Sequence, residues 1–308
     1  MEMRTRFLPH LNNAEAEAYL EQNDIIIVPV GTVEMHGGLP LDCETVVSEG
    51  IAVRMAEACD GLVLPNLPYF YSGATASGRG TTQVSVRAGI DYLYEIAKSL
   101  LRQGFKRQIY ISMHGPAHMT CSPVMRDFFD ETGVPILYMD LGIQLQNMMK
   151  EAAAKQAAEG GEASTTTNFF GSSVMTMFDA MILAGYDTLG RLDDVPLTTE
   201  FYHPGKPQSC AQFDDLFGSA YQSGAIGYCY GEHDDHMSTS PIPTAEARQE
   251  LADQGAVILD QLVASMDMPH VVEQMRNLEA YEDDAAEKWP WMPSAPAVAE
   301  KKAKAAEE

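Results

Sequence analysis

The chain has 308 residues, of which 45% are hydrophobic, enough for a substantial core in one α/β domain. Its 44 acidic and 20 basic residues give a formal net charge of -24, which repels nucleic acid and anionic membranes, so neither is an expected partner. The five cysteines form no C-x-x-C pair, and we find neither a signal-peptide core nor an apolar run of membrane-spanning length. We therefore expect a cytoplasmic protein.

Short apolar strands alternate with amphipathic helices through the first half of the chain. The run 24–30 (DIIIVPV) is typical of a strand buried on both faces. The alternation indicates βαβ units and predicts a layered α/β/α fold with a mainly parallel central sheet. We expect strands at 24–30, 62–67, 108–112 and 135–139, and helices at 44–59, 88–101, about 122–129, and 143–158.

The second half of the chain is less regular. Helical spacing returns at 172–183 and 244–266, while the stretch 187–222 is irregular and rich in turn residues. We expect a single domain over residues 1–285 and a C-terminal extension over 286–308. The end of that extension, APAVAEKKAKAAEE, is low in complexity and is expected to be disordered.

Ionisable side chains follow two of the predicted strands. Sites in parallel α/β sheets form beyond the carboxyl ends of the strands, which marks residues 31–44 (GTVEMHGGLPLDCE) and 114–118 as the candidate site. Glu34 and His36 are alternate residues, so in extended chain they point to the same side. Carboxylate and imidazole ligands together suit zinc, manganese or iron(II).

Additional acids and a histidine strengthen this interpretation. His114 follows the strand at 108–112, and Asp42 and Glu44 return carboxylates to the neighbourhood of Glu34. Each residue also has a structural explanation, because the histidines can bond to the backbone and the two acids can cap or charge a helix N-terminus. Their combination at strand ends favours a site for a divalent metal ion.

A second cluster of ionisable residues lies at 231–236 (GEHDDH). It is either a solvated acidic loop, or it brings Glu232, His233 or His236 to the site as a general base or an extra ligand. His118, close to His114, is expected to face the substrate or support a ligand. The candidates for catalysis are thus Glu232, His233 and His118. The candidates for substrate binding are Arg79, His203 and His236.

The segment after the first strand resembles the creatininase (creatinine amidohydrolase) family. That family opens with P-x-G-[ST]-x-E-x-H-G-x-H-L-P-L-x-T-D-T, and residues 29–45 here read PVGTVEMHGGLPLDCET. A second family landmark, N-G-H-G-G-N or N-G-H-x-E-N, corresponds to SMHGPA at 112–117. The resemblance implies metal ligands at Glu34, His36, His114 and Glu44, with Asp42 as the alternative acid. It also implies a homo-oligomer, often a hexamer.

The chain departs from the family pattern in three places. Pro116 stands where creatininase has an acid, the segment 169–176 (FFGSSVMT) lacks the acids of the family's H-A-G-E-x-E-T-S, and the tryptophans associated with creatinine have no clear counterpart. A single metal ion is therefore the simpler expectation, and creatinine is in doubt as the substrate. The variant pattern is more similar to the branch that hydrolyses 3-dehydro-scyllo-inosose.

The expected function is hydrolysis of a small cyclic polar substrate by metal-bound hydroxide. The first expectation is carbon–carbon ring opening of 3-dehydro-scyllo-inosose in inositol catabolism, a branch of carbohydrate metabolism. The alternatives are hydrolysis of a cyclic amide or a formamide, and a non-catalytic member that binds a polyol or a metal. A flavin or nicotinamide oxidoreductase is disfavoured, since no G-x-G-x-x-G follows a strand.

Overall fold

The computed structural model describes residues 3–158, 172–199, 213–219, 224–230, 236 and 240–307. Within them the predicted α/β fold is confirmed. The strands are β1 (Ile25–Pro29), β2 (Leu62–Val63), β3 (Arg107–Ser112) and β4 (Leu137–Asp140). The α-helices are α1 (Asn13–Leu20), α2 (Cys43–Cys59), α3 (Val86–Gln103), α4 (His118–Thr132), α5 (Leu141–Ala158), α6 (Ser172–Thr188), α8 (Asp214–Ser219), α9 (Ala245–Met266), α10 (Met268–Lys288) and α11 (Ala295–Glu307). Short 3₁₀ helices are η1 (Leu8–His10), η2 (Gly73–Ser77), η3 (Gly115–Ala117) and η4 (Leu192–Asp194).

The four strands form a parallel sheet in the order β2-β1-β3-β4. Ile27 on β1 pairs with Val63 on β2 and with Ile109 on β3, while Ser112 at the end of β3 pairs with Asp140 at the end of β4. Because the strands are parallel, their carboxyl ends meet at one edge of the sheet. Residues that follow different strands are thereby brought to the same place.

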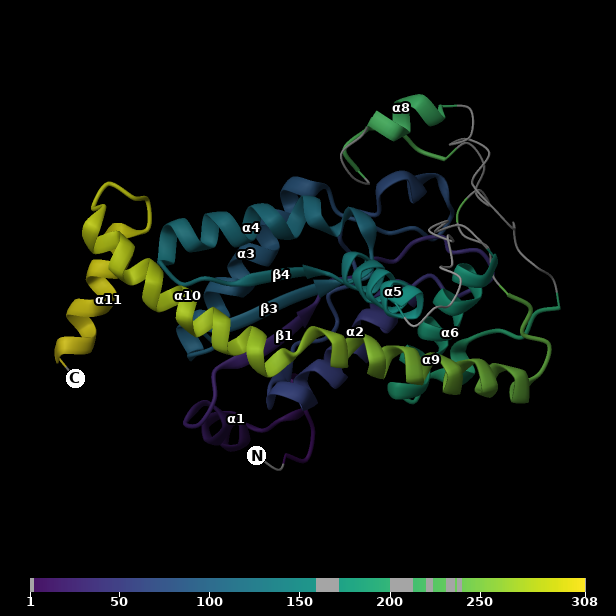
Figure 1. Cartoon of the computed structure of the whole chain (residues 1–308), viewed down its shortest axis with the longest axis horizontal. Helices are drawn as coiled ribbons and strands as arrows, with labels where there is room; N and C mark the ends of the chain where they lie inside the picture. Colours follow the sequence, from purple (N-terminus) through teal and green to yellow (C-terminus); the bar gives the residue numbers. More distant parts are fainter. Residues whose placement is uncertain are drawn as a thin grey trace.

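Helices cover both faces of the sheet, since successive side chains of a strand point to opposite faces. Ile25 and Ile27 pack into a core with α2, α6 and α9, whereas Ile26 and Val28 pack into a second core with α3 and α4. Figure 1 shows the resulting layers, with α3 and α4 on one side of the strands and α2 on the other. The solid apolar run of β1 is buried at all five positions, as its sequence predicts.

Two of the predicted elements have different limits in the structure. β2 ends at Val63, although the predicted strand continues to residue 67, because Pro65 has no backbone N–H with which to continue the pairing. α4 begins at His118, earlier than the predicted start near residue 122, because η3 leads directly into it and Pro123 is accommodated inside the helix. Among the described residues, no helix is both long enough and apolar enough to cross a bilayer.

The C-terminal end of the chain is helical, which corrects the expectation of disorder. Its alanines, lysines and glutamates form α11, and these residue types are strong helix formers. The Lys301 ammonium pairs with Glu279 at 3.0 Å and with Asp283 at 2.6 Å, both on α10. Glu279 in turn binds Arg107 at 2.5 Å, at the start of β3. This chain of ion pairs holds α11 and α10 at the end of the sheet opposite the candidate site.

Candidate metal centre

The loop after β1 lies against the start of α2. A Cβ added at Gly31 would sit 2.1 Å from Oγ1 of Thr45 and 2.7 Å from its Cα, so this approach requires glycine. The Thr45 hydroxyl donates a hydrogen bond to the carbonyl of Thr32 at 2.9 Å. The loop reverses at Gly37, whose φ of +60° also favours glycine. Glu34, within the loop, is thereby held beside the first turn of α2.

Two carboxylates converge on one imidazole at the carboxyl edge of the sheet. Nδ1 of His114 lies 2.6 Å from Oε2 of Glu44 and 3.1 Å from Oε1 of Glu34. All three side chains are buried, with exposed fractions of 1% for Glu34, 7% for Glu44 and 3% for His114. The residues come from the loop after β1, the first turn of α2 and the end of β3, so the sheet topology brings them together.

The orientation of the His114 ring determines which nitrogen can bind a metal. Nε2 lies 3.0 Å from the carbonyl oxygen of Tyr71, and a carbonyl can only accept a hydrogen bond, so Nε2 carries the proton. In the neutral ring, the lone pair of Nδ1 then faces the carboxylates of Glu34 and Glu44. That arrangement is favourable only when a proton or a cation lies between them. A hydrogen bond from the other ring nitrogen to a backbone carbonyl commonly orients a metal-binding histidine.

The electrostatics of this cluster favour a positive charge within it. Burial favours the neutral ring of His114, but Glu34 and Glu44 outweigh burial and hold its pKa well above the usual value. Burial and the nearby Glu34 raise the pKa of Glu44. Burial opposes ionisation of Glu34 as well, yet His114 keeps the pKa of Glu34 below its usual value. Without a cation, the three groups must share a proton.

Two further histidines complete the surroundings of Glu34. His36 is 2% exposed, and its ring centre lies 5.2 Å from that of His236 in an edge-on contact. Burial lowers the pKa of His36 to about 3 and that of His236 to about 4, so both rings are neutral near pH 7. Neutral imidazole is the form that binds metal ions. Among the described residues, both ring nitrogens of His36 and Nε2 of His236 are buried without a hydrogen-bond partner.

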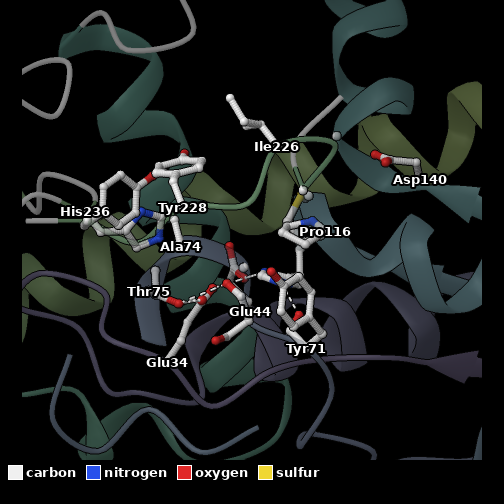
Figure 2. Close-up of a pocket in the computed structure, with 18 of the residues that line it drawn as sticks. Glu34, Glu44, Tyr71, Ala74, Thr75, Pro116, Asp140, Ile226, Tyr228 and His236 are labelled. Atoms are coloured by element: carbon white, nitrogen blue, oxygen red, sulfur yellow. Dashed lines mark hydrogen bonds and ion pairs between the residues drawn. The ribbon is translucent and has the colours of Figure 1, made fainter. Parts of the chain in front are cut away.

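A cavity of about 460 Å³ opens above these groups. Its floor includes Glu34, Glu44 and His114, and its walls include the aromatic residues Tyr71, Phe178, Tyr228 and Tyr230. Figure 2 shows the two carboxylates at the bottom of the view, with His236 and Tyr228 on the left. The volume matches a small molecule. The cavity also explains why the polar atoms of the floor lie deep in the protein and still remain reachable.

Asp140 lines the same cavity and was not anticipated. It ends β4, and its Oδ1 accepts a hydrogen bond from the backbone N–H of Ile143 at 3.0 Å, at the start of α5. Burial raises its pKa, although hydrogen bonds from the backbone of Ile143 and Gly142 oppose this. Figure 2 places Asp140 across the cavity from His236. Asp140 is thus a second acid of the cavity, separate from the carboxylates of the floor.

The structure places the remaining predicted site residues as follows. Asp42, the alternative to Glu44, turns away from the cavity to pair with Arg191 at 2.9 Å and to accept a hydrogen bond from the Tyr186 hydroxyl. Arg79 is exposed, and neither Arg79 nor His118 is among the described residues that line the cavity. The His118 ring instead bonds to the carbonyl of Gly115 at 2.9 Å. Three candidates lie outside the described residues, namely His203, Glu232 and His233.

Several residues of the cavity were not predicted, and most of them carry no clear signal in the sequence. Tyr71 acts through its backbone carbonyl, which every residue type possesses. Phe178 comes from α6, far from the sheet edge in sequence, and its helix packs mainly as core. Asp140 was detectable, because it directly follows a predicted strand at the same edge as Glu34 and His114. The strand-end argument that found those two residues applies to Asp140 equally.

Comparison with known proteins agrees with this geometry. Residues 9–228 match the family described as Creatininase: Creatinine amidohydrolase. The match spans well over half of the chain, so the chain belongs to the creatininase family. The matching region contains Glu34, His36, Glu44 and His114, and it ends before His236.

The individual relatives are distant. A creatinine amidohydrolase from Pseudomonas putida is 28% identical over 115 residues, which cover 35% of this chain and 44% of the relative. A 3-dehydro-scyllo-inosose hydrolase from Thermotoga maritima (strain ATCC 43589 / DSM 3109 / JCM 10099 / NBRC 100826 / MSB8) is 34% identical over 98 residues, which cover 31% of this chain and 32% of the relative. The chain therefore matches less than half the length of either relative. The two matches do not show whether the chain is more similar to the creatinine amidohydrolase or to the inosose hydrolase.

The likeness in structure extends further than the likeness in sequence. A solved mutant creatininase has a TM-score of 0.57 at 18% identity, and the match covers 88% of this chain and 99% of that protein. At such low identity the likeness shows the fold alone. The layered arrangement of α-helices around a parallel sheet is therefore that of the creatininases.

Proposed function

We propose that this chain is a metal-dependent hydrolase that opens a small cyclic polar substrate. The observation that carries the proposal is the buried meeting of Glu34 and Glu44 with Nδ1 of His114 at the floor of a cavity. Two carboxylates and an imidazole lone pair are a donor set for zinc, manganese or iron(II). Solved structures of creatininases with this fold include a manganese form and a Zn-Zn form, which supports the same class of ion.

The side chains of this donor set are already held in position for a cation by their own hydrogen bonds. Oε2 of Glu34 accepts a hydrogen bond from the Thr75 hydroxyl, while Oε1 faces Nδ1 of His114 at 3.1 Å. The Tyr71 carbonyl fixes the ring of His114, and the N-terminus of α2 favours a negative charge on Glu44. When bound, a divalent ion would lower the pKa of a water molecule and polarise a substrate carbonyl.

We assign 3-dehydro-scyllo-inosose as the first substrate to test. In this reaction water adds to one carbonyl of a cyclic 1,3-diketone and the ring carbon–carbon bond breaks. The electron pair is held as an enolate by the second carbonyl, and a proton then reaches the carbon. Ser72, Asp140 and Gln146 give the cavity polar groups suited to the hydroxyls of such a ring. The inosose hydrolase relative supports this choice.

A cyclic amide is the second candidate, and the creatinine amidohydrolase relative favours it. Here the bond that breaks joins carbon to nitrogen, so the leaving nitrogen must receive a proton. Asp140 lines the cavity and has a raised pKa, which makes it the described side chain best suited to donate that proton. The two substrates therefore make different demands on Asp140, because the enolate of the diketone is stabilised by its own carbonyl.

The test is an assay of both substrates with the chain freed of metal and then reloaded with zinc or with manganese. We expect ring opening of 3-dehydro-scyllo-inosose only in the reloaded protein, and loss of this activity in Glu44→Gln. Asp42→Asn is the matched control, since that acid lies two residues away and pairs with Arg191 outside the cavity. Absence of turnover for both substrates at full metal occupancy would remove the proposed function.

A further inference from the structure

An exposed apolar stripe runs along α10 to its C-terminal end, away from the candidate metal centre. Leu278, Tyr281 and Ala285 of α10 and Trp289 at its C-cap follow one another at spacings of three or four residues, so they lie on one side of the helix. Leu278 is 45% exposed, Tyr281 68% and Trp289 43%, and Trp291 in the turn that follows is 75% exposed. Figure 1 shows this turn at the far end of the molecule from α5, which borders the cavity.

Other residues hold the two C-terminal helices in place. The buried side of α10 is formed by Met268, Val272, Met275 and Ala286. Ala295 and Val298 of α11 pack with Ala286 and Met292 in a small core between the helices, and the ion pairs of Lys301 join the same two helices. The largest apolar side chains of this region therefore lie outside an anchored pair of helices. Exposed apolar surface of this kind, rich in tryptophan and tyrosine, is typical of interaction sites.

We propose that the apolar stripe is a docking surface for a basic amphipathic helix of another protein. The spacing of Leu278, Tyr281 and Ala285 is that of the a and d positions of a heptad, through which two helices pack along their length. In that register Glu282 and Asp284 take the e and g positions on either side of the seam. Side chains at e and g meet those of the partner helix and select it by charge. Basic residues of the partner would complement both acids.

The same charges disfavour a second copy of this chain on the stripe. Two α10 helices packed side by side would bring Glu282 and Asp284 against the same acids, in either relative direction. Two chains with a formal net charge of -24 also repel each other at longer range. One base lies at the stripe, since the Lys288 ammonium sits 5.1 Å from the centre of the Trp289 ring. Acidic side chains nevertheless outnumber basic ones on α10, so the surface favours a basic partner.

Tryptophan fluorescence makes this surface directly observable, because Trp289 and Trp291 are the two tryptophans of the chain. The probe is a synthetic peptide of three heptads without aromatic residues, with leucine at a and d and lysine at e and g. Its addition to the full-length chain should shift the tryptophan emission to shorter wavelength in a saturable manner, because the peptide covers the indole rings. The same peptide with glutamate in place of lysine should cause no shift.

Variants separate docking on the stripe from general charge attraction. Tyr281→Ala, which removes an exposed ring from the stripe, should weaken binding of the lysine peptide by at least about 10-fold. Tyr92→Ala is the matched control, since Tyr92 is a 56% exposed tyrosine on α3, and it should bind as the wild type does. Glu282→Lys combined with Asp284→Lys should reverse the preference, so that the glutamate peptide binds instead. Thermal melting of each variant establishes that it is folded.

The proposal is overturned if millimolar lysine peptide leaves the emission of the wild type unchanged, or if the charge reversal leaves the preference unchanged. Sedimentation velocity of the wild type and Tyr281→Ala provides a second measurement, and we expect the same oligomeric state for both. A smaller assembly in Tyr281→Ala would show that a second copy covers the stripe, which would also overturn the proposal. None of these results depends on metal binding or hydrolysis, so the proposed function is tested separately.

Discussion

Nδ1 of His114 and Oε2 of Glu44 lie 2.6 Å apart and join the end of β3 to the first turn of α2. The contact connects a helix that covers one face of the sheet to the strand that pairs with β1, and the loop after β1 supplies Glu34. Because Nε2 of His114 is bound to the Tyr71 carbonyl, Nδ1 can balance the carboxylates only through a proton or a cation.

Replacement of Glu44 by glutamine should abolish tight metal binding. The change keeps the shape of the side chain but removes the negative charge that faces His114. We expect zinc affinity to fall by more than about 100-fold, since loss of an outer partner alone costs 10–100-fold. Isothermal titration with zinc measures the effect. Unchanged affinity in Glu44→Gln, or an equal loss in the control Asp42→Asn, would show that Glu44 is not a ligand.

Metal loading should stabilise the fold. A ligand that binds only the folded state adds about 2.7 kcal/mol to the free energy of unfolding at 100 times its Kd. We expect the midpoint of thermal unfolding to rise on addition of zinc or manganese to the metal-free chain. In His114→Ala most of this rise should disappear, because the imidazole that faces both carboxylates is gone. An equal rise in wild type and His114→Ala would place the stabilising ion elsewhere.

Asp140→Asn should impair catalysis without affecting the metal. Asparagine retains an oxygen that accepts the hydrogen bond from the Ile143 backbone, so the start of α5 is preserved. We expect kcat/KM for a cyclic amide to fall by at least about 100-fold, the usual contribution of a general acid. The fall for 3-dehydro-scyllo-inosose should be smaller. Steady-state kinetics with elemental analysis tests this, and a loss of bound metal in Asp140→Asn would contradict the assigned role.

Stability should depend on pH through Asp179, which accepts a hydrogen bond from the backbone N–H of Ser240. Burial raises the pKa of Asp179 to about 6, against the opposing hydrogen bonds from Ser240, whereas the unfolded chain has a value near 3.9. The folded state therefore holds this proton more tightly. The resulting contribution to stability is complete below pH ~4 and is lost as the pH rises through about 6.

Asp179→Asn isolates this contribution, because asparagine does not titrate and can still accept the bond from Ser240. Relative to the variant, the wild type should lose about 1.4 kcal/mol of unfolding free energy between pH 5 and pH 7.5, close to one pKa unit. Urea unfolding at a series of pH values measures the difference. Parallel curves for the two proteins would mean that Asp179 is not held in its protonated form by burial.

Much of the fold follows from hydrophobic periodicity. The unbroken apolar run of β1 predicts a strand covered on both faces, and the amphipathic pattern of α3 predicts its helix to within a few residues. Periodicity does not locate the ends of elements as well. η3 extends α4 towards the site through its own backbone hydrogen bonds, and α11 is held by ion pairs to α10 that the local sequence does not reveal.

Part of the candidate site could also be predicted from the sequence, because its residues follow the predicted strands. Glu34, His36 and His114 stand at strand ends, and the structure brings them to one edge of the sheet together with Glu44. The choice between Glu44 and Asp42 required the structure, because it depends on the direction of each side chain from the first turn of α2. The position of His236 also depended on tertiary contacts, since His36 and Tyr230 place its ring beside Glu34.

The most direct test of the metal centre is anomalous diffraction from a crystal of the metal-loaded chain at the zinc or manganese edge. We predict an anomalous peak that places the metal ion within bonding distance of Nδ1 of His114 and of carboxylate oxygens of both Glu34 and Glu44. Nε2 of His114 should still donate its hydrogen bond to the Tyr71 carbonyl. A fully loaded crystal that has no peak between these three side chains, and in which Nδ1 keeps its direct contact with Glu44, would contradict the account.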